Sequence, residues 1–494
     1  MKYSFKRNFY YDLEKFITSN INQYCLFLTG PRKCGKTIAL KQLEICSNRC
    51  VNYVDFKLFK SLEESTSCIT KVIESILRGH DIIYALDEIT YMSYPYQELV
   101  RIAHAYEDAE LKGVEIKTKT IFTGSQSKAI SLWGHSVFCN SARFLEVSFL
   151  QYDEWIEWRN IKDIDKYSYE QFCLDTINFY DKFNSLQDYL EGCLEETIMS
   201  NMKSTSVSQT VECDLITSEI VTNTLYLILL TLHNNVSYKT LFKKDTLIDS
   251  INYLHATIFK DTYKSKSDLQ ESIRNSYVGR LNNIGHISYE QLRQSIVFLI
   301  EIGLITATPI QFDIKSPINV LSELKKKSLV LGSKEAIVDN INYTFNYPMF
   351  YVEIIKEAFK DFNITSLGGY LLGSVFETHA RGLLSAKGSF EYRTEEDIEL
   401  DYVNCFNKIS VELTISNKKI SNTHFDCLEN DYLNILTTRD IKDFSGNIKR
   451  IPFAEFIYNL SKYGLDSIID IVTSKRSDSV SKLDEFVSSI KKEY

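Results

Sequence analysis

A glycine-rich segment near the start of the chain carries a lysine and a hydroxyl residue at a defined spacing. Gly30 and the run Gly35-Lys36-Thr37 fit the pattern G-x-x-x-x-G-K-[ST], directly after an apolar run and before a helix-forming one. Glycines let backbone N–H groups approach phosphates, Lys36 can reach the β- and γ-phosphates, and the Thr37 hydroxyl can bind Mg²⁺. The pattern therefore predicts an ATP-binding loop made of Gly30, Pro31, Arg32, Lys33, Cys34, Gly35, Lys36 and Thr37.

Two adjacent carboxylates end a second apolar run. The run from Ile82 to Leu86 is followed directly by Asp87 and Glu88. A carboxylate at the tip of a strand next to the glycine-rich loop can hold Mg²⁺ through water, and its neighbour can act as a general base on the attacking water. We therefore predict Asp87 as a metal-binding residue and Glu88 as a catalytic one. The competing interpretation is a strand that ends in a solvated acidic turn.

A third candidate is the hydroxyl of Ser125, in the segment Thr123-Gly124-Ser125 after another apolar run. A hydroxyl at the tip of a strand beside the glycine-rich loop can sense the γ-phosphate. Serine and threonine are also common turn formers at strand ends, which is the competing interpretation.

These segments are predicted to lie in an α/β domain. Residues 1–155 alternate short β-rich runs with helical stretches, and near-continuous apolar runs are typical of parallel strands covered on both faces. The expected strands are 24–28, 51–54, 82–86, 120–122 and 144–147. From about Tyr152 to Asn235 the pattern is helical. Further on, Ser288 precedes an amphipathic helix, and Gly303 separates that helix from a strand at 304–307, as in a winged helix.

Composition limits the remaining possibilities. The formal net charge is −9, which argues against broad sequence-independent coating of DNA, although a local basic run occurs at Lys325-Lys326-Lys327. The most apolar stretch, 225–230, is far shorter than the roughly 20 residues that span a bilayer, and no secretory signal is visible at the start. The 11 cysteines include no C-x-x-C pair. We expect free thiols, no membrane association and a cytoplasmic location.

Together the motifs resemble the archaeal-type AAA ATPases of prokaryotes. The resemblance rests on the strand and Gly-Pro-Arg-x-x-Gly-Lys-Thr loop, the strand ending in Leu-Asp-Glu-Ile, the strand ending in Thr-Gly-Ser, and the segments 142–146 and 152–155. It implies an AAA-type core with a parallel sheet at 1–155, a helical lid at 156–235, and a winged-helix-like domain with linker at 236–345. It also implies that Arg143 meets the γ-phosphate, in the same chain or in a neighbouring subunit. An arginine that pairs with Glu146 is the alternative.

Members of this family often end in a restriction-endonuclease-like domain, and 346–494 resembles a degenerate form of it. Asp401 and Glu412 match the two carboxylates of the metal site, but Thr414 occupies the lysine position. We therefore expect a weak second metal site at Asp401 and Glu412 with little or no cleavage. Lys418 or Lys419 could replace the missing lysine.

The leading functional hypothesis is an enzyme that binds ATP and Mg²⁺ and hydrolyses ATP as a molecular switch or motor. Its C-terminal domains would contact nucleic acid or a protein partner, and oligomers are possible. One alternative is an ATP-dependent nuclease. Another is a slow-hydrolysing nucleotide-binding module that acts only through interactions.

Overall fold

The computed structural model describes most of the chain. The described residues are 5–19, 23–92, 94–124, 127–138, 141–178, 186–203, 215–234, 249–250, 287–311, 341–358, 367, 369–384, 389–393, 399–404, 407–417, 425, 428 and 431–473. Ser125, Lys325-Lys326-Lys327, Lys418 and Lys419 lie outside them.

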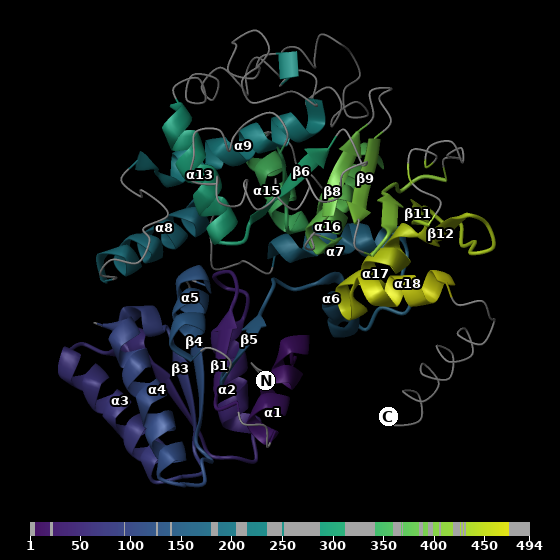
Figure 1. Ribbon diagram of the computed structural model, residues 1–494. Helices are drawn as coiled ribbons and strands as arrows, with labels where there is room; N and C mark the ends of the chain where they lie inside the picture. The colour runs from purple at the N-terminus through teal and green to yellow at the C-terminus, as the bar shows by residue number, and fades with distance from the viewer. Residues whose placement is uncertain are drawn as a thin grey trace.

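The N-terminal part of the chain is an α/β unit built on a five-stranded sheet (Figure 1). The strand order is β2-β3-β4-β1-β5, and every pairing is parallel. The strands are β1 (Cys25–Thr29), β2 (Val51–Asp55), β3 (Ile83–Asp87), β4 (Lys119–Thr123) and β5 (Ala142–Glu146). The predicted α/β core with a parallel sheet is therefore confirmed, with strand bounds shifted by only one or two residues.

Helices cover this sheet. The α3 helix begins after Ser61, whose side chain accepts a hydrogen bond from the N–H of Glu64 at 3.2 Å, and α4 begins with Pro95. Both are typical first-turn signals, since each reduces the number of unsatisfied N–H groups. The helical elements of this unit are α1 (Asn8–Thr18), α2 (Lys36–Cys46), η1 (Phe56–Leu58), α3 (Leu62–Leu77), η2 (Ile89–Tyr91), α4 (Pro95–Leu111) and α5 (Ser127–Phe138).

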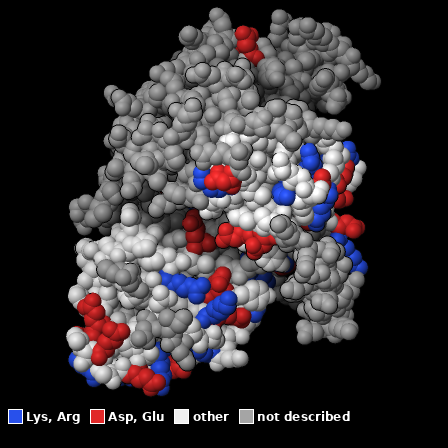
Figure 2. Space-filling model, turned by 45° about the vertical axis from the view of Figure 1, so that its right-hand side comes forward, with Lys and Arg blue, Asp and Glu red and all other residues white. Residues whose placement is uncertain are grey.

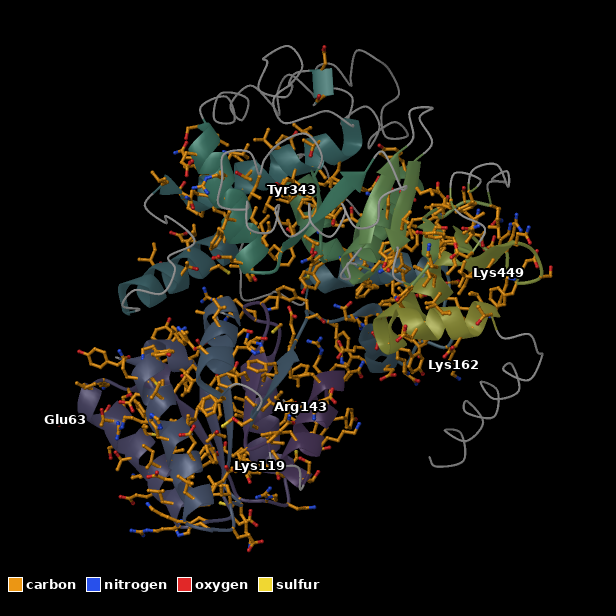
Figure 3. The ribbon with its side chains drawn as sticks, in the orientation of Figure 1. Glu63, Lys119, Arg143, Lys162, Tyr343 and Lys449 are labelled. Atoms are coloured by element: carbon orange, nitrogen blue, oxygen red, sulfur yellow. The ribbon has the colours of Figure 1, made fainter. Side chains whose placement is uncertain are left out.

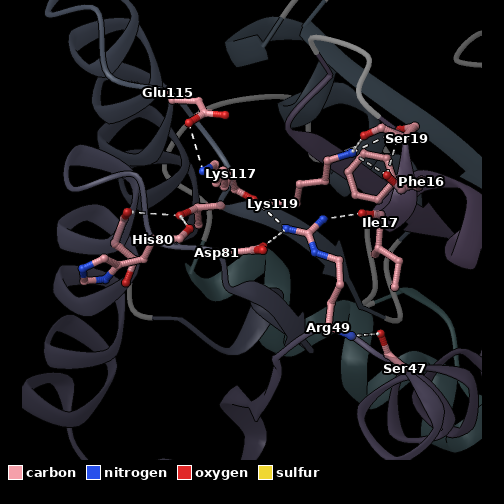
Figure 4. A network of polar contacts seen from close by, with 12 residues as sticks. Phe16, Ile17, Ser19, Ser47, Arg49, His80, Asp81, Glu115, Lys117 and Lys119 are labelled. Carbon is pink, nitrogen blue, oxygen red and sulfur yellow. Dashed lines mark hydrogen bonds and ion pairs between the residues drawn. The ribbon is translucent and has the colours of Figure 1, made fainter.

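The C-terminal end of α1 is fixed to the sheet by two basic residues (Figure 4). The Lys119 ammonium donates to the carbonyl oxygens of Phe16 at 2.5 Å and Ser19 at 2.6 Å. Arg49 donates to the carbonyl of Ile17 and pairs with Asp81. The last carbonyls of a helix have no partner within the helix, so these donors satisfy them and hold α1 against the edge of the sheet opposite the glycine-rich loop.

The remaining helices lie mostly in the second half of the molecule, a name used here for the part of the chain from Tyr152 onward. Ser288 and Gln291 form a capping box at the start of α13, and Gly303 follows that helix in the left-handed conformation with φ 74°. The predicted serine cap and glycine stop are therefore confirmed. These helices are α6 (Tyr152–Arg159), α7 (Lys166–Asn178), α8 (Leu186–Lys203), α9 (Ser218–Asn234), α13 (Tyr289–Glu301), α15 (Pro348–Ala358), α16 (Gly369–Leu384), α17 (Phe453–Tyr463) and α18 (Leu465–Thr473).

A second sheet of seven strands runs through this half in the order β12-β11-β10-β9-β8-β6-β7. Its strands are β6 (Ile305–Gln311), β7 (Ile341–Phe345), β8 (Ser389–Arg393), β9 (Glu399–Asn404), β10 (Ile409–Glu412), β11 (Leu433–Thr438) and β12 (Ile448–Pro452). The strands β6 and β7 form an antiparallel pair, and β6 joins this pair to the rest of the sheet by pairing in parallel with β8. The sheet thus continues across the boundary expected at 345/346, and the division of 236–494 into a winged helix and a nuclease-like domain stays a prediction.

An aromatic cluster joins the two halves. Phe149, in the segment after β5, lies with its ring centroid 4.6 Å from that of Tyr347 and 5.3 Å from that of Phe350. Tyr189 of α8 packs against Phe350 at 5.4 Å. Phe149 is only 1% exposed, and complete burial of such a side chain contributes about 1.5–3 kcal/mol. Because the segment with Phe149 comes directly after β5, the edge of the first sheet that carries the glycine-rich loop faces the second half (Figure 1).

The network around Lys119 makes stability depend on pH. Burial, reinforced by Arg49, lowers the pKa of Lys119 to about 8, against roughly 10.4 in an unfolded chain. Between these values the unfolded chain binds more protons, so the contribution of Lys119 rises with pH, by at most about 1.4 kcal/mol per pH unit. Urea denaturation from pH 7.5 to 10 should show this rise in the wild type relative to Lys119→Met.

The matched control is Lys117→Met, because Lys117 is exposed and pairs with Glu115 at 2.9 Å. That variant should keep the pH dependence of the wild type. Parallel pH profiles for the wild type and Lys119→Met would show that Lys119 keeps an ordinary pKa.

Candidate nucleotide-binding site

The glycine-rich loop connects β1 to α2 and requires its two glycines for different reasons. Gly30 has φ +141°, and a Cβ at this position would lie 2.1 Å from the carbonyl oxygen of Val147. Gly35 has φ +102° and precedes the first residue of α2. Neither conformation is open to an ordinary side chain. The backbone between the two glycines is therefore held in a tight turn that ends at the N-terminus of a helix, which is a favourable place for an anion.

Lys36 is folded into this turn. Its ammonium donates to the carbonyl oxygens of Gly30 at 2.7 Å and Pro31 at 2.8 Å, and the side chain is buried. The loop therefore holds a cation at its centre. The same ammonium can exchange carbonyl oxygens for phosphate oxygens, which are the stronger acceptors because they are charged.

Thr37 and Asp87 meet at the end of the sheet. The Thr37 hydroxyl donates to Asp87 Oδ2 at 2.7 Å, and the Tyr53 hydroxyl donates to the same oxygen at 2.9 Å. Burial raises the pKa of Asp87 above its usual range, and the hydrogen bonds from Thr37 and Tyr53 oppose that shift. A hydroxyl and a carboxylate at this separation fit Mg²⁺, a hard cation that prefers oxygen ligands. The ion would also stabilise the ionised form of Asp87.

Tyr53 was not among the residues predicted from the sequence. It lies on β2, and the β2–β3 register pairs it with Ala85, two residues before Asp87. Its hydroxyl therefore reaches along the neighbouring strand to the carboxylate. A tyrosine in an ordinary strand pattern gives no local signal for such a contact, so only the pairing of β2 with β3 reveals it.

Glu88 follows Asp87 in an uncommon backbone conformation. Its φ is 55°, in the left-handed region, and its N–H donates to Asp87 Oδ1 at 3.0 Å. A left-handed conformation at a residue other than glycine costs of order 1 kcal/mol or more and tends to occur at functional sites. The half-buried Glu88 side chain therefore begins at the same corner of the sheet as Thr37 and Asp87.

Within a single chain, Arg143 does not lie at the end of the sheet where Thr37 and Asp87 meet. In the β1–β5 register it pairs with Leu26, three residues before Thr29, which ends β1 and precedes Gly30. Three strand residues span roughly 10 Å. Arg143 instead lies beside α1 (Figure 3) and pairs with Asp12 at 3.5 Å, with both side chains partly exposed. The alternative pairing with Glu146 is not the ion pair seen here.

Comparison with known proteins agrees with this geometry. Residues 22–156 match the family model described as an AAA domain. This part of the chain is an AAA domain. The match covers the five-stranded sheet with its glycine-rich loop and the carboxylates at the end of β3, so the resemblance to the AAA ATPases is confirmed over this region. No curated protein matches the chain.

Two solved structures align with the chain at low similarity. One is entitled a DNA replication initiation factor, with 12% identity, a TM-score of 0.25, and coverage of 71% of this chain and 93% of the other. The second is Cdc6p from Pyrobaculum aerophilum, with 13% identity, a TM-score of 0.27, and coverage of 60% and 95%. These scores are too low to carry an argument about function or domain arrangement.

At the second predicted metal site, formed by Asp401 and Glu412, the Asp401 carboxylate is bound by an arginine and a backbone N–H. Asp401 Oδ1 accepts from Arg381 at 2.7 Å, and Oδ2 accepts from the N–H of Leu413 at 2.7 Å. Arg381 also pairs with Glu377 at 2.7 Å. Burial, with Glu412 and Glu377 nearby, raises the pKa of Asp401 well above its usual range, while Arg381 opposes the shift.

An arginine therefore supplies the positive charge beside this carboxylate, and both oxygens of Asp401 are engaged. Within the ranges that the structure describes, no group of three or more His, Cys, Asp or Glu residues is placed to hold a metal ion. Asp401 and Glu412 thus do not fit a magnesium site, because Arg381 lies where a cation would have to bind. Thr414, at the expected lysine position, instead hydrogen-bonds Thr437 through its backbone N–H at 2.6 Å.

The loop of the AAA domain contacts the segment predicted as a lid. The Tyr189 hydroxyl donates to the carbonyl of Arg32 at 3.4 Å. An added Cβ on Gly192 would lie 2.0 Å from a guanidinium nitrogen of Arg32. Arg32 is therefore packed against α8 rather than facing solvent, and a glycine at 192 is what leaves room for it.

This contact predicts an effect of Gly192→Ala on nucleotide affinity. The new methyl group would displace the Arg32 guanidinium and disturb the loop, so ATP should bind about three- to tenfold more weakly, ~0.7–1.4 kcal/mol. The same change in an Arg32→Ala background should have almost no effect, since the clash is gone. Calorimetric titration of the four proteins measures this coupling.

The control is Gly373→Ala, also within a helix, where the added Cβ would meet Ile415 at an ordinary 3.6 Å. It should leave ATP affinity unchanged. Equal affinity in Gly192→Ala and the wild type would mean that α8 does not constrain the loop.

Proposed function

We propose that this protein binds ATP with Mg²⁺ in its AAA domain and hydrolyses it as a molecular switch or motor. The observation that carries the proposal is the 2.7 Å hydrogen bond between Thr37 and Asp87, at the open end of a loop with a buried lysine. These are the three groups that a nucleotide triphosphate and its metal ion require. The described helices include none long and apolar enough to cross a membrane.

The bound nucleotide would place its β- and γ-phosphates against the N-terminus of α2. Lys36 would donate to phosphate oxygens in place of the carbonyls of Gly30 and Pro31. Thr37 and Asp87 would hold Mg²⁺, which supplies charge neutralisation on the phosphates when bound. The Tyr53 hydroxyl would keep the Asp87 carboxylate oriented toward Thr37. Ser125, which follows β4 beside β1, keeps the proposed role of sensing the γ-phosphate.

Glu88 is the proposed general base. It adjoins Asp87, and its strained backbone fixes the direction in which the side chain leaves the strand. A carboxylate in that position can accept a proton from the water that attacks the γ-phosphate, or orient that water. If Glu88 lacked this role, the protein would be the slow-hydrolysing interaction module.

Arg143 is proposed to act between subunits rather than within one chain. Its distance from the loop along β5 and its partly exposed pairing with Asp12 favour this over a role in the same chain. An arginine supplied by a neighbour stabilises charge that develops on the transferred phosphoryl group. This role requires an oligomer, at least transiently.

The partner of the switch is proposed to be a protein or nucleic acid that contacts the second half of the molecule. Arg293 on α13 pairs with Glu290 on the same helix, with Nε 3.0 Å from Oε1. On the face shown in Figure 2, the described part displays acidic and basic side chains interspersed, without a continuous basic surface. Together with the net charge of −9, this face favours a protein partner over extended DNA contact. The ATP-dependent nuclease is disfavoured by the pairing of Asp401 with Arg381.

Lys36→Ala and Glu88→Gln should separate binding from hydrolysis. The first removes the cation at the phosphates and should weaken ATP binding at least tenfold, about 1.4 kcal/mol. The second keeps the shape of the side chain, so ATP should bind normally while turnover falls roughly 10²–10⁴-fold. Calorimetry and phosphate-release assays give the two quantities.

Lys112→Ala and Glu107→Gln are matched controls, because both side chains are exposed and lie at the C-terminal end of α4, outside the glycine-rich loop. Wild-type affinity in Lys36→Ala would place the nucleotide elsewhere. Wild-type turnover in Glu88→Gln would remove Glu88 from the mechanism.

A further inference from the structure

Arg7, directly before α1, connects the nucleotide-binding loop to the segment after β5. Its guanidinium donates to the carbonyl oxygen of Cys34 at 2.8 Å, and to those of Ser148 at 3.1 Å and Phe149 at 2.9 Å. Its Nε lies 2.8 Å from both carboxylate oxygens of Glu154. All three guanidinium nitrogens therefore donate, and the side chain is largely buried. The planar fork of an arginine suits such a set of acceptors, whereas a lysine could satisfy only part of it.

The bond to Cys34 controls a peptide of the loop itself. The Cys34–Gly35 peptide is planar and trans, so its C=O and its N–H point in opposite directions. Because Arg7 holds the carbonyl, the N–H of Gly35 is directed away from Arg7. Gly35 adopts a left-handed conformation, which leaves this peptide without the restraint that a side chain would impose. The hydrogen bond from Arg7, which lies outside the loop, restricts this peptide to one orientation.

Glu154 in turn holds Arg7 in place. Its carboxylate also accepts from the N–H of Asn8 at 2.8 Å and from the N–H of Gln151 at 3.1 Å, as part of the cap of α6. This gives the buried carboxylate four or more donors, enough to offset the cost of its burial. The α6 helix packs against α17, where Glu157 pairs with Lys462 at 2.6 Å. The position of the loop is thus linked through α6 to α17.

We propose that Arg7 is a positioning residue for phosphate binding. By holding the Cys34 carbonyl, it presents the Gly35 N–H to the phosphates, and by pairing with Glu154 it links that peptide to α6. This inference rests on the proposed ATP-binding function and adds a residue outside the loop motif. ATP and ADP should depend on Arg7 to the same degree, since backbone N–H groups of such a loop contact phosphates that both nucleotides share.

The test compares Arg7→Ala and Arg7→Lys with Arg49→Ala. Arg49 is the matched control because it also bridges α1 to the sheet, through Ile17 and Asp81, but at the opposite edge. Arg7→Ala should bind ATP and ADP at least tenfold more weakly, with an unchanged ratio between them, and Arg7→Lys should retain part of the affinity. Arg49→Ala should lower the melting temperature while the folded protein keeps wild-type affinity.

ATP affinity in millimolar guanidinium chloride is a further measurement, and it should not change if Arg7 has only a structural role. The ion can occupy the space left in Arg7→Ala and donate to Cys34 and Glu154, so it should restore ATP affinity there and leave the wild type unaffected. If Arg7→Ala does not fold, Arg7→Lys decides: weakened binding of both nucleotides supports the proposal, and wild-type affinity overturns it.

Failure of the proposed function and failure of the proposed role of Arg7 give different experimental results. Absence of ATP binding by the wild type contradicts the proposed function itself. ATP binding by the wild type, with the same affinity in folded Arg7→Ala, contradicts only the role of Arg7.

Discussion

The hydrogen bond from Thr37 to Asp87 is the constraint on which the site depends. It joins the first turn of α2 to the last residue of β3, and β4 lies between β3 and β1, the strand that leads into α2. Only a parallel sheet, whose strands all end at one edge, brings these residues together. The contact keeps a carboxylate buried beside a cationic loop, and this burial raises the pKa of Asp87 above its usual range.

The same edge of the sheet is also where the two halves of the molecule meet. Arg32 packs against Gly192, and a Cβ on Gly303 would lie 3.5 Å from Pro31, so helices α8 and α13 both approach the loop. The Phe149 cluster adds an apolar contact from the segment that Arg7 also holds. A nucleotide that moves Lys36 within the loop would therefore act at the place where the loop contacts the second half of the molecule. A switch needs such a shared element, whose state both sides influence.

Local patterns predicted the parts of this arrangement that are local. The strands, the loop between Gly30 and Thr37, and the Ser288 cap are each specified by residues close together in the sequence. The same holds for Asp87 and Glu88, whose corner follows from a strand ending in two carboxylates. In the second half, the strand predicted at 304–307 corresponds to the start of β6 (Ile305–Gln311), because Gly303 separates it from the preceding helix.

Contacts between distant residues were not predictable in this way. Arg7 and Glu154 are separated by 147 positions, and Arg381 and Asp401 come from a helix and a strand whose packing no periodicity reveals. The latter pair changes the interpretation of the C-terminal carboxylates, since the sequence showed a missing lysine but not the arginine that lies beside Asp401. Likewise, the pairing of β6 with β8 joins two regions that the family resemblance assigned to different domains.

A crystal structure of the protein with a non-hydrolysable ATP analogue and Mg²⁺ would show whether the glycine-rich loop, Thr37 and Asp87 bind the nucleotide and its metal ion. We predict phosphates in the loop, Lys36 moved from the carbonyls of Gly30 and Pro31 to the β- and γ-phosphates, and the metal ion at Thr37 and Asp87. A nucleotide bound at another place, or Lys36 still on those carbonyls beside a bound nucleotide, would contradict this prediction.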